Sequence, residues 1–222
     1  MRTGRPREFC VDEVLDRAMT VFWRHGYEGA SVAELTSAMG ISTPSLYACF
    51  GSKEALFQAV LDRYHVRQKD FMESMLAAPT AYAVAEKFLH GVSDFAAHTG
   101  GANPPGCLLL QSGLSCADTD IPDLLAKHRA DKEAALRARL ERAKKTGDIP
   151  KTASAPALAR YLMVIANGIC VQAAAGTTAK ELHQVAELAL LNWPGGAAAP
   201  ADVKTETPSR KSRTAATEIV RP

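Results

Sequence analysis

The chain of 222 residues is 47% hydrophobic and 23% charged, which is ordinary for a globular protein and leaves room for two domains. The formal net charge of +2 does not by itself indicate a nucleic-acid partner, so the placement of the charges matters more than their sum. No uninterrupted apolar run approaches the roughly 18 residues that cross a bilayer, and the polar N-terminus lacks the apolar core of a secretory signal. We therefore expect a cytoplasmic protein without membrane contact.

The N-terminus forms the first feature in chain order, a short basic segment. Arg2, Arg5 and Arg7 crowd its first seven residues, and Gly4 and Pro6 disfavour a helix there. Such a cationic arm can enter a DNA minor groove or lie along phosphates. A basic terminus without any role is the alternative for this segment alone.

Two helices are predicted next. Apolar residues at three-to-four spacing predict a helix over 11–25, which Gly26 ends. Ser31 is placed to cap a second helix whose inward residues are Val32, Leu35, Thr36 and Met39, and Gly40 ends it.

A third, two-turn helix over 43–50 follows after only three residues, with Ser42 as its N-cap. Two short helices across a turn that contains glycine are typical of a helix-turn-helix. Leu46, Cys49 and Phe50 share the face that we expect to pack inward. The outward residues are Thr43, Pro44, Ser45, Tyr47 and Ala48.

Anion-binding features flank this third helix. The Tyr47 hydroxyl points outward, where a DNA phosphate would satisfy it. Ser52 can cap a fourth helix over 53–75, and its first N–H groups together with Lys53 form a natural anion site. Ser31 and Ser42, at the starts of the second and third helices, complete the candidate DNA-binding set with Arg5 and Arg7.

A specific combination of residues runs through these helices: Phe22, Gly26-Tyr27, Ser31-Val32, Ile41-Ser42, Leu46-Tyr47, Phe50, Ser52-Lys53-Glu54 and Leu56. From about Val11 to Val60 the chain thereby resembles the DNA-binding segment of the TetR/AcrR repressor family. The resemblance implies that Thr43, Pro44 and Ser45 touch base edges, while Tyr47 and Lys53 bind phosphates. Thr43-Pro44 and Ala48 depart from the residues frequent in the family, so a base preference does not carry over.

The remaining chain predicts an all-α larger domain. Helices are expected over 81–98, 121–146, 156–175 and 179–193, with a loop over 100–106 and a short apolar segment over 107–114. From residue 195 the composition turns to Ala, Pro, Thr, Ser and Lys without apolar periodicity, which predicts disorder. We therefore divide the chain into a DNA-binding domain (1–60), a ligand-binding and dimerisation domain (61–195) and a tail (196–222).

The resemblance also implies a homodimer through the last two helices, a palindromic double-stranded operator and a small-molecule effector. A single short recognition helix has little groove contact, and a dimer that reads two half-sites corrects this. Completion of the monomer core is the alternative role for these helices. Candidate effector-lining residues, which point to an apolar compound or belong to the core, are Phe71, Phe88, Phe95, Leu109, Leu125 and Met163.

Five cysteines stand at wide spacings without a CxxC pair, which favours free thiols over a disulfide framework or a zinc site, and no metal or cofactor is expected. Cys107 follows a Pro-Pro-Gly bend, with Cys116 nine residues later. Some relatives with a similar Gly-Cys-Leu stretch respond to electrophiles or oxidants, so this pair is a redox candidate, and ordinary core packing is its alternative.

Two other functions compete with DNA binding. A thiol enzyme would need Cys107 beside His90, His98 or His128, but no catalytic motif pairs them, so we expect no enzyme. A helix-turn-helix that contacts only proteins would not need Tyr47 and Lys53. The expected function is a sequence-specific DNA-binding transcriptional regulator, a dimeric repressor rather than an activator, released from its operator by a small-molecule or redox signal.

Overall fold

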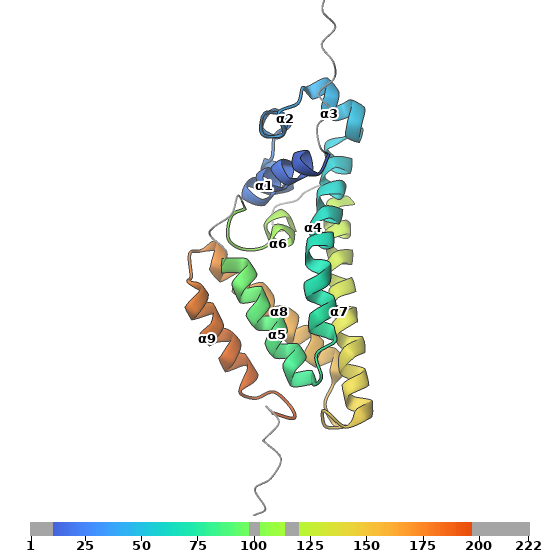
Figure 1. The fold of residues 1–222 in the computed structure, drawn as a ribbon, viewed down its shortest axis with the longest axis vertical. Coiled ribbons are helices and arrows are strands. Elements are labelled where there is room, and N and C mark those ends of the chain that lie inside the picture. Colours follow the sequence, from blue (N-terminus) through green and yellow to red (C-terminus); the bar gives the residue numbers. More distant parts are fainter. Residues whose placement is uncertain (1–10, 98–102, 114–119, 197–222) are drawn as a thin grey trace, which may run out of the picture.

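In a computed structural model, the described residues (11–97, 103–113 and 120–196) are helical with short connections and contain no strand (Figure 1). The all-α prediction is confirmed. The helices are α1 (Val11–Gly29), α2 (Val32–Met39), α3 (Thr43–Phe50), α4 (Lys53–Leu76), α5 (Ala81–Ala97), α6 (Leu108–Gly113), α7 (Asp120–Thr146), α8 (Ala155–Ala174) and α9 (Ala179–Leu190). Arg5, Arg7, Cys116 and the tail from residue 197 lie outside the described residues.

Serine hydroxyls begin three of the first four helices, as predicted. The N–H of Glu34 donates to Ser31 Oγ over 3.2 Å, and that of Ser45 donates to Ser42 Oγ over 3.2 Å. The N–H of Ala55 donates to Ser52 Oγ over 3.0 Å. Each bond satisfies a backbone donor that the first helical turn leaves without a partner. Local sequence therefore sets the start of α2, α3 and α4.

Gly26 interrupts α1 where the sequence predicts its end. Its backbone angles are φ 68° and ψ 179°, a conformation essentially restricted to glycine, and the chain then continues to Gly29. A Cβ at this position would lie 3.2 Å from the carbonyl oxygen of Gln111 in α6. Gly26 thus serves both the turn and the close approach of α6.

The N-terminal helices share a hydrophobic cluster with parts of α6 and α7. Leu35, Leu46 and Phe57 are fully buried in this cluster. Four further members come from the later helices: Leu108, Leu109, Ile121 and Leu125. Within this cluster α1 packs on α6 and α4 packs on α7, whereas α3 packs on α2 and α4.

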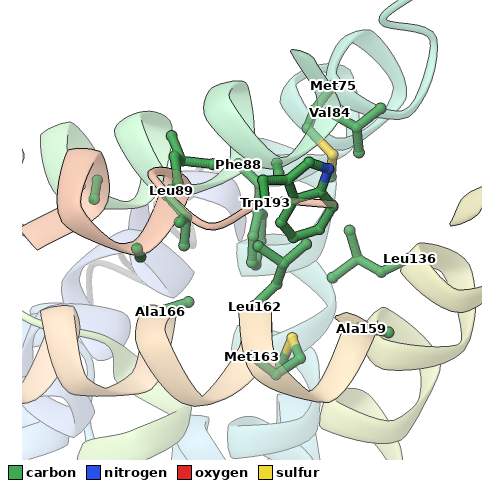
Figure 2. Close-up of a cluster of buried hydrophobic side chains, with 14 of the residues drawn as sticks. Met75, Val84, Phe88, Leu89, Leu136, Ala159, Leu162, Met163, Ala166 and Trp193 are labelled. Carbon is green, nitrogen blue, oxygen red and sulfur yellow. The ribbon is translucent and has the colours of Figure 1, made fainter. Parts of the chain in front are cut away.

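A second hydrophobic cluster joins α5, α7, α8 and α9. Figure 2 shows the Trp193 indole beside Phe88 and above Leu162, with Leu136 of α7 on one side. Buried Arg139 of α7 donates to the backbone carbonyls of Leu76 and Ala78, over 3.1 and 2.8 Å, and so fixes the chain that leaves α4. This cluster forms the body of the molecule opposite α3 (Figure 1).

An apolar stripe on α8 and α9 has no cover within the described chain. Val164 is 60% exposed and Leu188 is 65% exposed. By length and composition alone α8 could cross a membrane, although Arg160, Asn167 and Gln172 interrupt its apolar residues. Its other face packs on α5, α7 and α9, so this helix has one side in the domain core and one side uncovered.

Candidate nucleic-acid interface

Helix α3 lies at one end of the molecule, away from α8 and α9 (Figure 1). Leu46 is its only buried residue and anchors it on the N-terminal cluster. Thr43 and Pro44 are exposed, Ser45 is partly exposed, and Tyr47 is 47% exposed. The structure therefore brings these four residues together on the exposed part of a helix, the element that the DNA major groove admits.

The two serine hydroxyls at the start of α3 hydrogen-bond to each other. Ser42 Oγ and Ser45 Oγ lie 2.8 Å apart, and the Ser42 oxygen also accepts the Ser45 N–H. Ser31 differs, because its hydroxyl donates to the Glu34 carboxylate over 2.8 Å while its own N–H donates to the same group. These bonds from Ser31 lower the pKa of Glu34, first through the backbone N–H. The hydroxyl hydrogen of Ser31 is thus already in use.

Lys53, at the start of α4, lies over the ring of Tyr27 with its Nζ 4.6 Å from the ring centroid. A cation above an aromatic face is attracted by the electrons of the ring. The contact holds the ammonium beside the open N-terminus of α4. Lys53 was predicted from the sequence, whereas this role of Tyr27 was not, although its place in the Gly-Tyr pair could have suggested it.

Cys49 contradicts the prediction for the inner face of this helix. It was expected to pack inward with Leu46 and Phe50, but its side chain is exposed and Phe50 is only partly buried. Helix α3 has just two turns and touches α2 and α4 over small areas, so one leucine suffices to anchor it. The residue three positions after Leu46 lies past the edge of that contact.

An ion-pair network joins α1 to α4. Arg63 binds Asp16 through two nitrogens, one of them at 2.8 Å, and reaches Asp12 at 2.9 Å. Arg67 approaches the same Asp16 carboxylate at 2.6 Å. The hydrogen bond from Arg63 lowers the pKa of Asp16, and the Asp16 carboxylate in turn raises the pKa of Arg63. The orientation of α4 is therefore tied to the first helix of the predicted DNA-binding domain.

A cavity of about 630 Å³ lies between α1, α4, α5, α7 and residues 103–104. Three predicted effector residues, Phe71, Phe88 and Phe95, line it. Leu109 and Met163 line a neighbouring cavity of about 50 Å³. Leu125 instead belongs to the N-terminal hydrophobic cluster. The structure thus groups half of the predicted effector residues around one space.

Cys107 lies beside Cys170 of α8, a neighbour that the sequence did not indicate. Hydrogen bonds from the thiol of Cys170 and from the hydroxyl of Tyr64, whose oxygen is 3.5 Å from Cys107 Sγ, lower the pKa of Cys107. The same contact with Cys107 raises the pKa of Cys170. The two thiols therefore form a hydrogen-bonded pair, next to the hydroxyl of Tyr64.

Comparison with known proteins agrees with these features. The family model described as "Bacterial regulatory proteins, tetR family" matches residues 14–60. The chain is 36% identical to the HTH-type transcriptional repressor ComR of Escherichia coli (strain K12) over 196 residues, covering 86% of this chain and 92% of that protein. It is 32% identical to the repressor BdcR of the same organism over 127 residues, covering 56% and 62% of the two chains.

A solved structure is similar along most of the chain. It is the TetR family transcriptional regulator CifR, as a cysteine mutant in complex with 26-base-pair double-strand operator DNA. The two chains are 36% identical, the match covers 86% of this chain and 100% of CifR, and the TM-score is 0.80.

Proposed function

Since the chain belongs to the TetR family and is a DNA-binding regulator of transcription, we propose that it is a cytoplasmic homodimer that represses transcription by occupying a palindromic operator. The observation that carries the proposal is the separation of two surfaces. The exposed polar residues of α3 lie at one end of the molecule. The apolar stripe lies on α8 and α9, away from that end (Figure 1).

The stripe supports the dimer. Tyr161, Val164 and Val171 follow one face of α8, with Gly168 exposed among them, and Leu188 continues the stripe on α9. A Cβ at Gly168 would meet nothing within 4 Å in the single chain. A glycine on an open apolar face leaves room for a second helix to approach closely. The partner that fits is a second copy of this chain, which presents the same surface.

The DNA contacts divide into two kinds. Thr43, Pro44 and Ser45 are assigned to base edges, because they are small and outward on α3. Tyr47 and Lys53 are assigned to phosphates on either side of the groove, and Ser42 and the arm with Arg5 and Arg7 to further backbone contacts. Ser31 would join them only by giving up its hydrogen bonds to Glu34. Base contacts carry sequence preference, whereas phosphate contacts contribute affinity to every sequence.

Selection of bound sequences from a random DNA pool at moderate salt tests this function. A recovered palindrome is expected. Ser45→Ala should change the preferred bases, whereas Lys53→Ala should weaken binding to all sequences and reduce the salt dependence. Lys151→Ala, on an exposed connection before α8, is the matched control and should change neither property. Failure to recover any motif would refute operator binding, and an unchanged preference in Ser45→Ala would refute the assigned reading face.

Release of the operator is assigned to a small molecule in the cavity. By linkage, an effector that lowers operator affinity is itself bound more weakly when the operator is present. Phe71, Phe88 and Phe95 give this cavity an apolar lining. Residues of α1 and α4 line this cavity, so a bound molecule can shift these helices and with them the DNA-binding residues.

A redox signal is the second candidate, favoured by the contact between Cys107 and Cys170. A hydroperoxide would oxidise the Cys107 thiolate to a sulfenic acid and leave as an alcohol or water, and Cys170 would then condense with it to a disulfide with loss of water. Cys170→Ser should abolish release by peroxide while Cys49→Ser should not. Release that persists in Cys170→Ser would exclude this pair.

A further inference from the structure

The large cavity has an uneven charge distribution. Its lining includes Lys132, Arg67 and Asp94. Arg67 is paired with Asp16 at 2.6 Å, and Asp94, on the exposed rim, is paired with His183 at 2.7 Å. Lys132 donates to Gln68 Oε1 over 3.3 Å and forms no ion pair with any described residue. A partly buried ammonium with a single neutral acceptor leaves room for an anion.

The rest of the wall is mainly apolar and aromatic. Trp23 of α1 joins the three phenylalanines that line this cavity. Flat aromatic side chains favour the edges and faces of another aromatic ring at about 5 Å. The volume of about 630 Å³ falls in the range of pockets that enclose a drug-sized molecule.

Building on the repressor function above, we propose that the effector is an organic anion with an aromatic body, whose anionic group binds Lys132 and whose rings lie among Trp23 and the phenylalanines. Lys132 is the specificity-determining residue of this site. A neutral analogue of the same shape leaves the ammonium without its anion, so it binds more weakly.

The same cavity touches the DNA-binding helices directly. Trp23 is 97% buried and is held by ring contacts to Tyr64 at 5.4 Å and Phe95 at 5.8 Å, while its Nε1 has no hydrogen-bond partner. Asn103, also in the wall, accepts a hydrogen bond from Thr20 of α1 over 3.0 Å. A bound ring that displaces Trp23 therefore moves α1 itself, in addition to any movement of α4.

Trp23 also supplies the assay. The chain has two tryptophans, and Trp193→Phe leaves Trp23 as the sole tryptophan, whose emission can be excited selectively. In this background, biphenyl-4-carboxylate is titrated against its neutral isostere biphenyl-4-carboxamide and against the saturated bicyclohexyl-4-carboxylate. The carboxylate should change the Trp23 emission and bind at least about tenfold more tightly than the amide, the ratio that a charged hydrogen bond provides. The saturated acid should bind several-fold more weakly than the aromatic acid.

Lys132→Met should remove the preference for the carboxylate and leave the binding of the amide unchanged. The matched control is Lys127→Met on the same helix, whose lysine is exposed and paired with Asp131, and it should bind both compounds as the parent does. The three compounds on the parent protein test the charge and ring requirements without any cavity variant. Equal affinity for carboxylate and amide would overturn the anion site, and equal affinity for the two acids would overturn the aromatic requirement.

Measuring operator affinity tests the repressor function separately from the effector site on which the acid acts. The anisotropy of the labelled selected operator should show weaker binding when biphenyl-4-carboxylate is added. Binding of the operator with no change of Trp23 emission up to millimolar acid would overturn the effector class and leave the repressor function standing. Emission changes without any operator binding in the absence of acid would refute the repressor function while the cavity assignment stands. Binding of the acid without loss of operator affinity would overturn the coupling through α1.

Discussion

Replacement of Gly26 by alanine tests how the DNA-binding helices are joined to the larger domain. The backbone at this position, with φ 68° and ψ 179°, costs a residue with a Cβ about 1 to 3 kcal/mol. The added Cβ would also lie 3.2 Å from the Gln111 carbonyl oxygen, and a forced shift of packed backbone costs on the order of 1 kcal/mol or more. We expect Gly26→Ala to lower the free energy of unfolding by about 2 to 4 kcal/mol in total.

Gly147→Ala is the matched control. Gly147 also has a positive φ, 82°, but a Cβ there would meet nothing within 4 Å. Gly147→Ala should lower the free energy of unfolding only by the cost of its backbone conformation, about 1 to 2 kcal/mol. Urea unfolding followed by the helical circular dichroism measures both variants. Equal losses in the two variants would show that the approach of α6 contributes nothing at Gly26. An unfolding curve of Gly26→Ala that matches the parent would refute the backbone argument itself.

Three further outcomes are expected. Leu188→Glu should produce monomers in sedimentation velocity and weaken operator binding, because it places a charge in the apolar stripe, whereas Val66→Glu, an equally exposed position on α4, should remain dimeric. Arg139→Met should lower the free energy of unfolding by about 1 to 3 kcal/mol, since three backbone carbonyls lose their donor, and an unchanged thermal midpoint would contradict this. Asp16→Asn should destabilise the protein at neutral pH by about 1 kcal/mol. The hydrogen bond from Arg63 lowers the folded-state pKa of Asp16 below its ordinary 3.8, so this stabilisation is present above that pH and disappears as the pH falls through the lowered value. A difference between the two proteins that stays constant into acid would argue against the pair.

Signals that act within a few residues could be predicted from the sequence. Ser31, Ser42 and Ser52 begin their helices because a hydroxyl satisfies N–H groups two or three residues later, and no distant contact is needed for that. Gly26 ends the regular part of α1 because only glycine adopts its backbone angles at low cost. The spacing of these signals was sufficient to predict the helix-turn-helix, the all-α class and the family.

Contacts between distant residues were decided only by the tertiary structure. The exposure of Cys49 depends on how little of the two-turn α3 is covered by its neighbours, which periodicity within eight residues does not reveal. Cys107 gained Cys170 and Tyr64 as neighbours because the chain at the start of α6 contacts both α8 and α4, which spacing along the sequence does not reveal. The absence of an ion-pair partner for Lys132 among the described residues and the place of Trp23 in the cavity wall likewise depend on how α1, α4, α5 and α7 surround the cavity. Helix caps and period are local properties of the chain, whereas charge balance, cavities and thiol partners depend on which helix faces pack against each other.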